Sequence, residues 1–209
     1  MSSTLNPSSI QSKSPSPPNW FRGVIQGKTR IVLAWIFAFA LGFSAREYPN
    51  LPGILLCFIG ASLRYWASGF LRKDSRPAVG GPYALVRNPL YLGTYLMAVG
   101  TALSIGNYFL LGLVSVVFAM IYHFIILDEE TKLRVIFGEP YLKYCQTVPR
   151  FIPRIFPPQA SQLEQVNPEP SHRQFDSQIA KKNKAYEAYA SFAGLIGGVC
   201  LIAFLWKQF

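Results

Sequence analysis

Hydrophobic positions gather in five runs along the chain, with polar or charged segments between them. The runs cover residues 31–45, 51–71, 90–105, 108–127 and 189–206, and we predict a membrane-spanning helix for each. The first is short, reaching about 22 Å of a hydrocarbon core near 30 Å thick. A cleaved signal peptide ending at Phe43-Ser44-Ala45 is the alternative for this run, but the long polar leader before it argues against cleavage.

The segments around these runs suggest how the chain is organised. Residues 1–22 form a Ser/Pro-rich tail that we expect to be disordered, and residues 23–156 form a membrane core with four spans. The fourth helix is expected to continue beyond the membrane to Phe137, where Gly138 stops it, before a short amphipathic segment over 139–148. Residues 157–185 are polar and contain prolines, which predicts a linker to a final helix within 186–209.

Composition and charge support an all-α, integral membrane helical bundle with about five spans. The 209 residues are 51% hydrophobic and only 14% charged, whereas a soluble domain carries about 25% charged residues. Nearly all of the 20 basic residues fall in three segments. These lie before the first run, between the second and third runs, and between the fourth and fifth runs. The positive-inside rule therefore predicts a cytoplasmic N-terminus and an external C-terminus, and it explains the net charge of +10 without nucleic acid. The three cysteines have no spacing that suggests a disulfide framework or a metal site.

Two polar motifs are predicted to share the cytoplasmic face. The first is the stretch GGPYALVRNPLYLG at residues 80–93, where Gly80-Gly81-Pro82 lets the backbone turn sharply. Tyr83 then either contacts a ligand or anchors the chain at the interface. Asn88 and Pro89 favour a helix start, and Arg87 beside them either binds an anion or serves as a positive-inside anchor.

The second motif is Asp128-Glu129-Glu130, directly after the fourth apolar run. The acids have a structural explanation, because helical i,i+4 pairs with Lys132 and Arg134 are worth a few tenths of a kcal/mol each. Three adjacent acids at a membrane edge are also suited to holding a cationic ligand. Helical spacing puts His123 on the same stripe as Glu130, where an imidazole is a candidate base.

Taken together, these motifs resemble the isoprenylcysteine carboxyl methyltransferase and phospholipid methyltransferase superfamily. The matching segments are Gly81-Pro82-Tyr83, Arg87-Asn88-Pro89-Leu90-Tyr91-Leu92-Gly93, Glu129-Glu130, the Phe-Gly-x-x-Tyr-x-x-Tyr run over 137–144, and Val148-Pro149. Their order and spacing match over about residues 75–153.

The resemblance implies S-adenosyl-L-methionine as cofactor, S-adenosyl-L-homocysteine as product, and a lipophilic or prenylated acceptor that enters from the bilayer. The cofactor residues it implies are Ser75, Arg76, Pro77, Ala78, Gly81, Tyr83, Asn88, Pro89, Leu90, Tyr91, Glu129 and Glu130. The candidate catalytic residues are Arg87, Glu129 and His123. The size of the chain is consistent with a multi-pass protein of a bacterial inner membrane, with its site on the cytoplasmic side.

Departures from the superfamily pattern leave the acceptor open. Asn88 and Ser75 stand where the prenylcysteine enzymes have histidine, and Ile125 falls near their substrate arginine. Arg87 or Arg64 could take over that role for a carboxylate. Methylation of a phospholipid or amine is an alternative, as are a sterol-type NADPH reductase and a non-catalytic membrane scaffold. The paired glutamates favour a cationic cofactor over NADPH.

Overall fold

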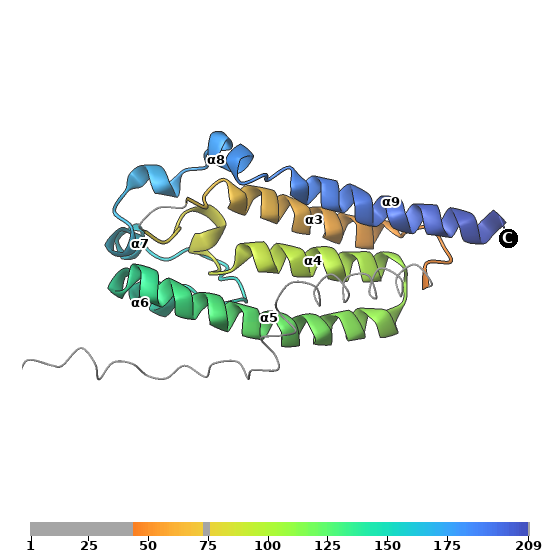
Figure 1. Cartoon of the computed structure of the whole chain (residues 1–209), viewed down its shortest axis with the longest axis horizontal. Coiled ribbons are helices and arrows are strands. Elements are labelled where there is room, and N and C mark those ends of the chain that lie inside the picture. The colour runs from red at the N-terminus through yellow and green to blue at the C-terminus, as the bar shows by residue number, and fades with distance from the viewer. Residues whose placement is uncertain (1–43, 73–75, 209) are drawn as a thin grey trace, which may run out of the picture.

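A computed structural model describes residues 44–72 and 76–208, and all regular structure in these ranges is helical (Figure 1). The all-α fold class is therefore confirmed, while the first predicted span lies almost wholly outside the described residues. The helices are α3 Leu51–Ser68, α4 Pro89–Ser104, α5 Tyr108–Phe137, α6 Glu139–Thr147, α7 Ala160–Val166, α8 Ser177–Lys182 and α9 Glu187–Gln208, with 3₁₀ turns η2 Gly81–Ala84 and η3 Pro170–Arg173.

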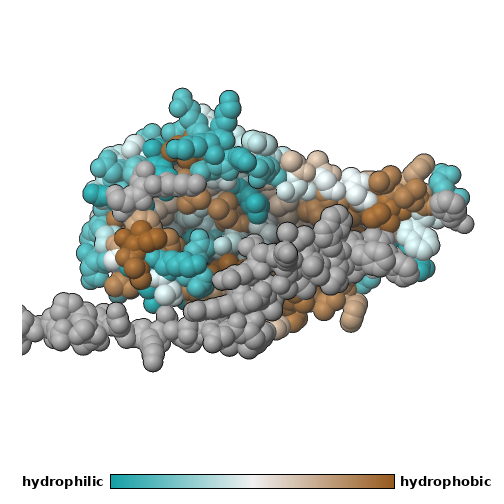
Figure 2. Space-filling view, viewed as in Figure 1, coloured by the Kyte–Doolittle hydropathy of each residue, from teal (hydrophilic) through white to brown (hydrophobic). Residues whose placement is uncertain are grey.

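Four long helices run beside one another in the order α9, α3, α4, α5, and α6 to α8 gather at one end of them (Figure 1). Within the described residues, α3, α5 and α9 are long and apolar enough to cross a membrane, and α4 is shorter at 16 residues. Large apolar side chains on these three helices are exposed, including Leu55, Phe58, Met120 and Phe204. The end that carries α6 to α8 is covered mainly by polar residues (Figure 2). The chain is therefore an integral membrane protein with one polar end.

The first turn of α3 is tied to the last turn of α4. Asn50 caps α3 by accepting a hydrogen bond from the Gly53 amide at 2.9 Å. Its own amide groups donate to α4, from the backbone to the Ser104 carbonyl at 2.9 Å and from the side chain to the Leu103 carbonyl at 2.7 Å. This one residue therefore fixes where the two helices meet.

Glycines let α3 and α4 approach until their backbones touch. A Cβ added at Gly53, Gly60 or Gly100 would lie 2.2–2.6 Å from backbone atoms of the facing helix. Gly194 and Gly198 of α9, by contrast, have no atom of the described residues within 4 Å of such a Cβ. Among the described helices, the close backbone contact is thus between α3 and α4.

Helix α5 is long enough to carry its acidic cluster past the bilayer core. Its 30 residues span about 45 Å, compared with about 30 Å for the hydrocarbon. The Asn107 side chain caps its start by accepting from the Leu110 amide at 2.9 Å, and Gly138, with φ of +60°, ends it. The predicted end at Phe137 is confirmed, and α6 follows directly.

Residues 157–185, which the sequence pattern treats as a linker, form α7, η3 and α8. Leu163 and Val166 on α7 are buried in a cluster with Val79, Tyr144 and other residues of α6 and the neighbouring loops. Two apolar residues three positions apart are enough to bury one face of a seven-residue helix. A pattern of only two positions is too short, however, for the helix to be predicted from the sequence. The segment is therefore packed onto the polar end of the bundle.

Candidate functional site

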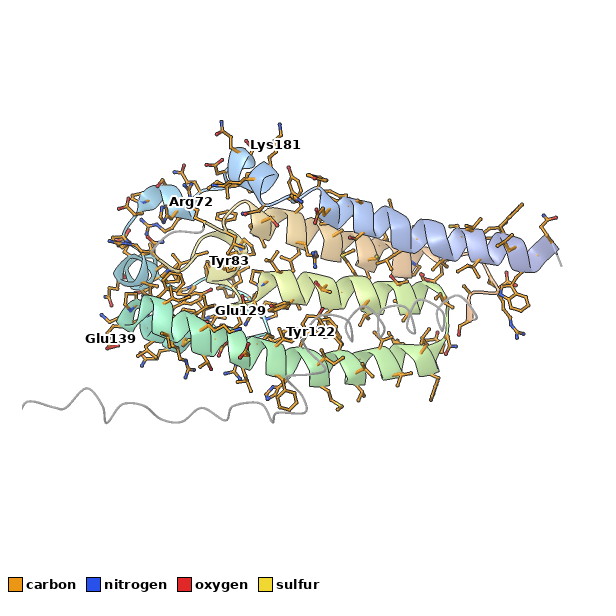
Figure 3. All side chains as sticks on the ribbon, viewed as in Figure 1. Arg72, Tyr83, Tyr122, Glu129, Glu139 and Lys181 are labelled. Carbon is orange, nitrogen blue, oxygen red and sulfur yellow. The ribbon has the colours of Figure 1, made fainter. Side chains whose placement is uncertain are left out.

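The polar end holds a cavity of about 240 Å³ between η2, the start of α4, the end of α5, and α6. Figure 3 shows Tyr83 and Glu129 at this end of the bundle, with Tyr122 farther along α5. The cavity is lined by Leu71, Arg72, Arg76, Pro77, Ala78, Tyr83, Arg87, Asn88, Pro89, Leu90, Tyr91, Glu129, Leu133, Phe137, Tyr141 and Tyr144.

The glycine-proline turn positions Tyr83 against the cavity. Gly81 has φ of +53°, and a Cβ there would lie 2.4 Å from the ring of Phe70, so the close turn requires glycine. The Tyr83 side chain is 7% exposed, and its carbonyl accepts a hydrogen bond from the Tyr144 hydroxyl at 2.7 Å. Burial, together with the negative charge of Glu129, raises the pKa of Tyr83 well above its ordinary value. Tyr83 is therefore a neutral hydroxyl and an aromatic surface at any physiological pH.

Glu129 presents a carboxylate to the cavity and is oriented by a tyrosine on the facing helix. The Tyr91 hydroxyl donates to Glu129 Oε2 at 2.6 Å, the length of a hydrogen bond to a charged oxygen. Both side chains line the cavity. A carboxylate held in this way can accept from an ammonium or hydroxyl group of a ligand.

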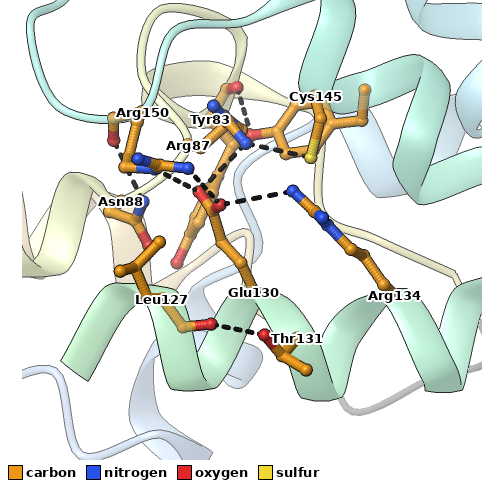
Figure 4. Close-up of polar contacts among 10 residues, drawn as sticks. Tyr83, Arg87, Asn88, Leu127, Glu130, Thr131, Arg134, Cys145 and Arg150 are labelled. Carbon is orange, nitrogen blue, oxygen red and sulfur yellow. Dashed lines mark hydrogen bonds and ion pairs between the residues drawn. The ribbon is translucent and has the colours of Figure 1, made fainter. Parts of the chain in front are cut away.

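Glu130 does not line the cavity and lies in a cluster of three arginines (Figure 4). It is 1% exposed. Arg150 binds both carboxylate oxygens, from Nε at 3.1 Å and Nη2 at 3.0 Å, and Arg87 Nη1 lies 2.9 Å from Oε1. Arg134 completes the cluster, with its Nη2 3.9 Å from Glu130 Oε2. The hydrogen bond to Glu130 raises the pKa of Arg150, and three guanidinium groups around one carboxylate leave a net positive charge at this end of the bundle.

Arg87 and Asn88 hold the segment after α6 against the start of α4. Asn88 occupies the position before α4 but makes no capping bond there; its side chain donates instead to the Arg150 carbonyl at 3.0 Å. The Arg87 amide donates to the Pro149 carbonyl at 2.9 Å. Asn88 therefore does not cap α4 as expected. Its hydrogen bond to the Arg150 backbone instead helps to place Arg150 beside Glu130.

A second cavity, of about 270 Å³, lies between α4, α5 and this segment. Aromatic rings dominate its wall: Phe118 stacks on Tyr122 at 3.7 Å between ring centroids, and Tyr95 lies 5.8 Å from Phe151. The other lining residues are Ser115, Ala119, His123, Ile126 and Arg150. The space is therefore apolar along most of its length, with an imidazole and a guanidinium at its polar edges.

Side-chain contacts connect the walls of the two cavities. Tyr91 of the first and Tyr122 of the second meet edge to face, with ring centroids 5.2 Å apart. Arg87 of the first and Arg150 of the second bind the same carboxylate, that of Glu130. The two cavities are thus neighbours in the fold.

The structure brings most of the predicted site residues to the first cavity. The residues that line it are Arg76, Pro77, Ala78, Tyr83, Arg87, Asn88, Pro89, Leu90, Tyr91 and Glu129. Gly81 shapes the turn, Glu130 lies in the arginine cluster, and His123 lines the second cavity. Ser75 lies outside the described residues.

Sequence reasoning did not assign Arg150 or the tyrosines of α6 to the site. Tyr141 and Tyr144 belong to the Phe-Gly-x-x-Tyr-x-x-Tyr run, whose three-residue spacing was a signal for one buried helix face. Burial raises the pKa of Tyr144, so this hydroxyl stays neutral and donates to the backbone of η2. Arg150 had no such signal beyond the general excess of basic residues. Among the described residues, no group of three or more histidine, cysteine or acidic side chains could hold a metal ion.

Comparison with known proteins identifies one family. Residues 57–140 match the phospholipid methyltransferase family model. The chain is 34% identical over 96 residues to the protein-S-isoprenylcysteine O-methyltransferase of Schizosaccharomyces pombe, covering 46% of this chain and 41% of the relative.

Two further relatives carry names that refer to metal resistance. The cobalt-zinc-cadmium resistance protein CzcN of Cupriavidus metallidurans is 27% identical over 73% of this chain and 74% of its own length. The nickel-cobalt-cadmium resistance protein NccN of Alcaligenes xylosoxydans xylosoxydans is 28% identical over 49% of this chain and 47% of its own. The chain thus spans less than half of two of these three relatives. No solved structure matches the chain.

Proposed function

Because the chain belongs to the phospholipid methyltransferase family through residues 57–140, we propose that it transfers a methyl group from S-adenosyl-L-methionine to a lipophilic acceptor. The observation that carries the proposal is the pair of neighbouring cavities, one with a carboxylate and several arginines in a largely apolar wall and the other lined mainly by aromatic rings. Methyl transfer needs two ligands whose reacting atoms meet, and the walls of the two cavities are in direct contact through Tyr91 and Tyr122.

The groups in the first cavity are suited to S-adenosyl-L-methionine. The cofactor combines a cationic sulfur, an amino group, a carboxylate and an adenine, and it supplies an electrophilic methyl group when bound. Glu129 would bind the cationic part, Arg72 or Arg76 the carboxylate, and the rings of Tyr83 and nearby aromatic residues the flat base. Tyr91 would keep the Glu129 carboxylate oriented through its 2.6 Å hydrogen bond.

The second cavity supports an amphiphilic acceptor, taken up with its apolar part among Tyr95, Phe118 and Phe151. Arg150 at its edge favours an acceptor with an anionic group, as in O-methylation of a carboxylate. An amine acceptor must first lose a proton, and His123 would accept it. Glu130 would act indirectly, by holding Arg87 and Arg150 between the two ligands.

The topology proposed for this function has five spans with a cytoplasmic N-terminus. Helices α3, α5 and α9 would cross the bilayer with α4 and with the run over residues 31–45, in a bacterial-type inner membrane. Basic residues are concentrated at the end that holds the cavities, which supports a site on the cytoplasmic side.

Calorimetric binding of S-adenosyl-L-homocysteine to detergent-purified protein tests the cofactor. We expect micromolar affinity that is lost in Glu129→Ala and kept in Glu139→Ala, since Glu139 is exposed at the start of α6. Binding of NADPH in place of the sulfur compound would support a sterol-type reductase. Folded protein that binds neither compound would support a membrane scaffold. Extracted lipids incubated with radiolabelled methyl donor would then distinguish an ester product from a methylated amine.

A role in metal resistance is the second candidate, favoured by the match to CzcN over about three quarters of both chains. It would be tested by expressing the protein in a metal-sensitive bacterium and measuring growth against cobalt, zinc, cadmium and nickel. Protection that disappears in Glu129→Ala would link resistance to the first cavity. Protection that survives this substitution would separate the two functions.

A further inference from the structure

Residues 160–183, which we call the C-terminal cap, lie against the loop that connects α3 to η2. The described residues of this loop are 69–72 and 76–80, and Leu71, Arg72, Arg76, Pro77 and Ala78 form one wall of the first cavity. The cap lies beyond residue 140, where the family match ends. The cap therefore lies outside the residues that match the family model.

Two asparagine side chains of the cap bind the two ends of the loop. Asn183 donates from Nδ2 to the carbonyls of Ser68 and Leu71, at 2.9 and 2.7 Å. Asn167, only 1% exposed, donates from Nδ2 to the Pro77 carbonyl at 3.1 Å. A buried amide that donates a hydrogen bond to a backbone carbonyl holds that carbonyl in place. Loss of the hydrogen bond would leave the carbonyl oxygen without a partner, which costs free energy.

Arg72 adds a charged link between the cavity wall and the cap. Its Nη2 donates to the Ser171 carbonyl at 3.2 Å and lies 3.5 Å from Asp176 Oδ2. The Asp176 amide in turn donates to the Gly69 carbonyl at 3.2 Å. The guanidinium of a cavity-lining residue is thus oriented by the cap.

Glycines at both ends of the loop make room for the cap. A Cβ at Gly80 would lie 2.6 Å from the Cα of Arg173, and one at Gly69 would lie 2.3 Å from the ring of Phe175. A backbone contact this close cannot be relieved by turning a side chain. The loop and the cap are therefore matched in shape as well as in hydrogen bonds.

We propose that the cap holds this loop in the shape that binds the cofactor, with Asn167 and Asn183 as positioning residues that set cofactor affinity. The inference rests on the proposed function, because the ligand of the first cavity is taken to be S-adenosyl-L-methionine. Neither asparagine lines the cavity, so each acts through the loop carbonyls that it binds.

The test compares Asn167→Ala and Asn183→Ala with Gln165→Ala in full-length protein. Gln165 is exposed on α7 and serves as the control within the cap. We expect the Kd for S-adenosyl-L-homocysteine to rise about tenfold in each asparagine variant and to stay unchanged in the control. Amide hydrogen exchange over residues 69–80 should accelerate in the ligand-free variants and be restored by saturating ligand.

The outcomes separate this inference from the proposed function. If the wild type binds the ligand and both asparagine variants bind it equally well, the cap does not set affinity and the inference fails while the function stands. If the wild type binds no ligand, both fail. Should an asparagine variant not fold, Gly80→Ala disturbs the packing of the loop against Arg173 of the cap, and an unchanged Kd there would equally overturn the inference.

Discussion

The neighbouring glutamates of α5 should respond to substitution in opposite ways. Glu130→Gln keeps the volume of the side chain but removes the charge that three arginines share. Breaking a buried ion pair costs about 3–5 kcal/mol, because the remaining charge stays buried. The side chain of Arg87 is 10% exposed, so its pair with Glu130 counts as a buried ion pair. The side chains of Arg134 and Arg150 are each 36% exposed, and their pairs with Glu130 stabilise the fold by about 1 kcal/mol or less each.

We therefore expect Glu130→Gln to lower the free energy of unfolding by about 3–5 kcal/mol, or the melting temperature by roughly 10 °C. The assay is thermal and denaturant unfolding in detergent, followed by circular dichroism. Glu129→Gln is the matched control one residue away, and its stability should change by about 1 kcal/mol or less while it loses ligand binding. A Glu130→Gln protein that melts within about 2 °C of wild type would refute the structural role of this cluster.

Three further predictions follow from the helix packing and the tyrosines. Gly100→Ala should destabilise the protein by about 1–3 kcal/mol because its Cβ would meet the α3 backbone at 2.4 Å, whereas Gly112→Ala, with nothing within 4 Å of its Cβ among the described residues, should melt at or above the wild-type temperature. Tyr91→Phe removes the hydrogen bond to Glu129 and should weaken S-adenosyl-L-homocysteine binding about tenfold by calorimetry, and equal binding would exclude this orienting role. The raised pKa of Tyr144 favours its neutral form in the folded protein, so stability should be full below pH 10 and fall as the pH rises above it. Tyr144→Phe should make this alkaline loss shallower in pH-dependent melting curves, although its stability at pH 7 falls by about 1 kcal/mol.

The sequence predicted the helical elements well where long apolar runs end in strong signals. Gly138 ends α5 as expected, because a positive φ at a glycine acts locally. The separate roles of Glu129 and Glu130 did not follow from the sequence. Adjacent residues on a helix point about 100° apart, and only the neighbouring elements decide which one meets the cavity and which one meets Arg150.

The residues that join distant segments were the hardest to predict. Asn88 looked like a local cap, but its side chain reaches the Arg150 carbonyl, 62 positions away. Asn167 and Asn183 stand in a polar segment whose composition suggests a linker, and their partners lie 90 to 115 positions earlier. Single polar contacts of this kind leave no periodic trace in a sequence.

The separation between the loop and the cap has a consequence for how the protein is made. Helices α3 and α4 have both been synthesised by residue 104, whereas Asn183 follows 79 positions later. At about 5–20 residues per second, a ribosome needs roughly 4 to 16 s to add that length of chain. During this interval the carbonyls of Ser68 and Leu71 lack the Asn183 amide that binds them in the finished fold, and the Pro77 carbonyl lacks its partner until Asn167 is added. The polar end is therefore completed late, after the membrane helices beneath it can already have packed.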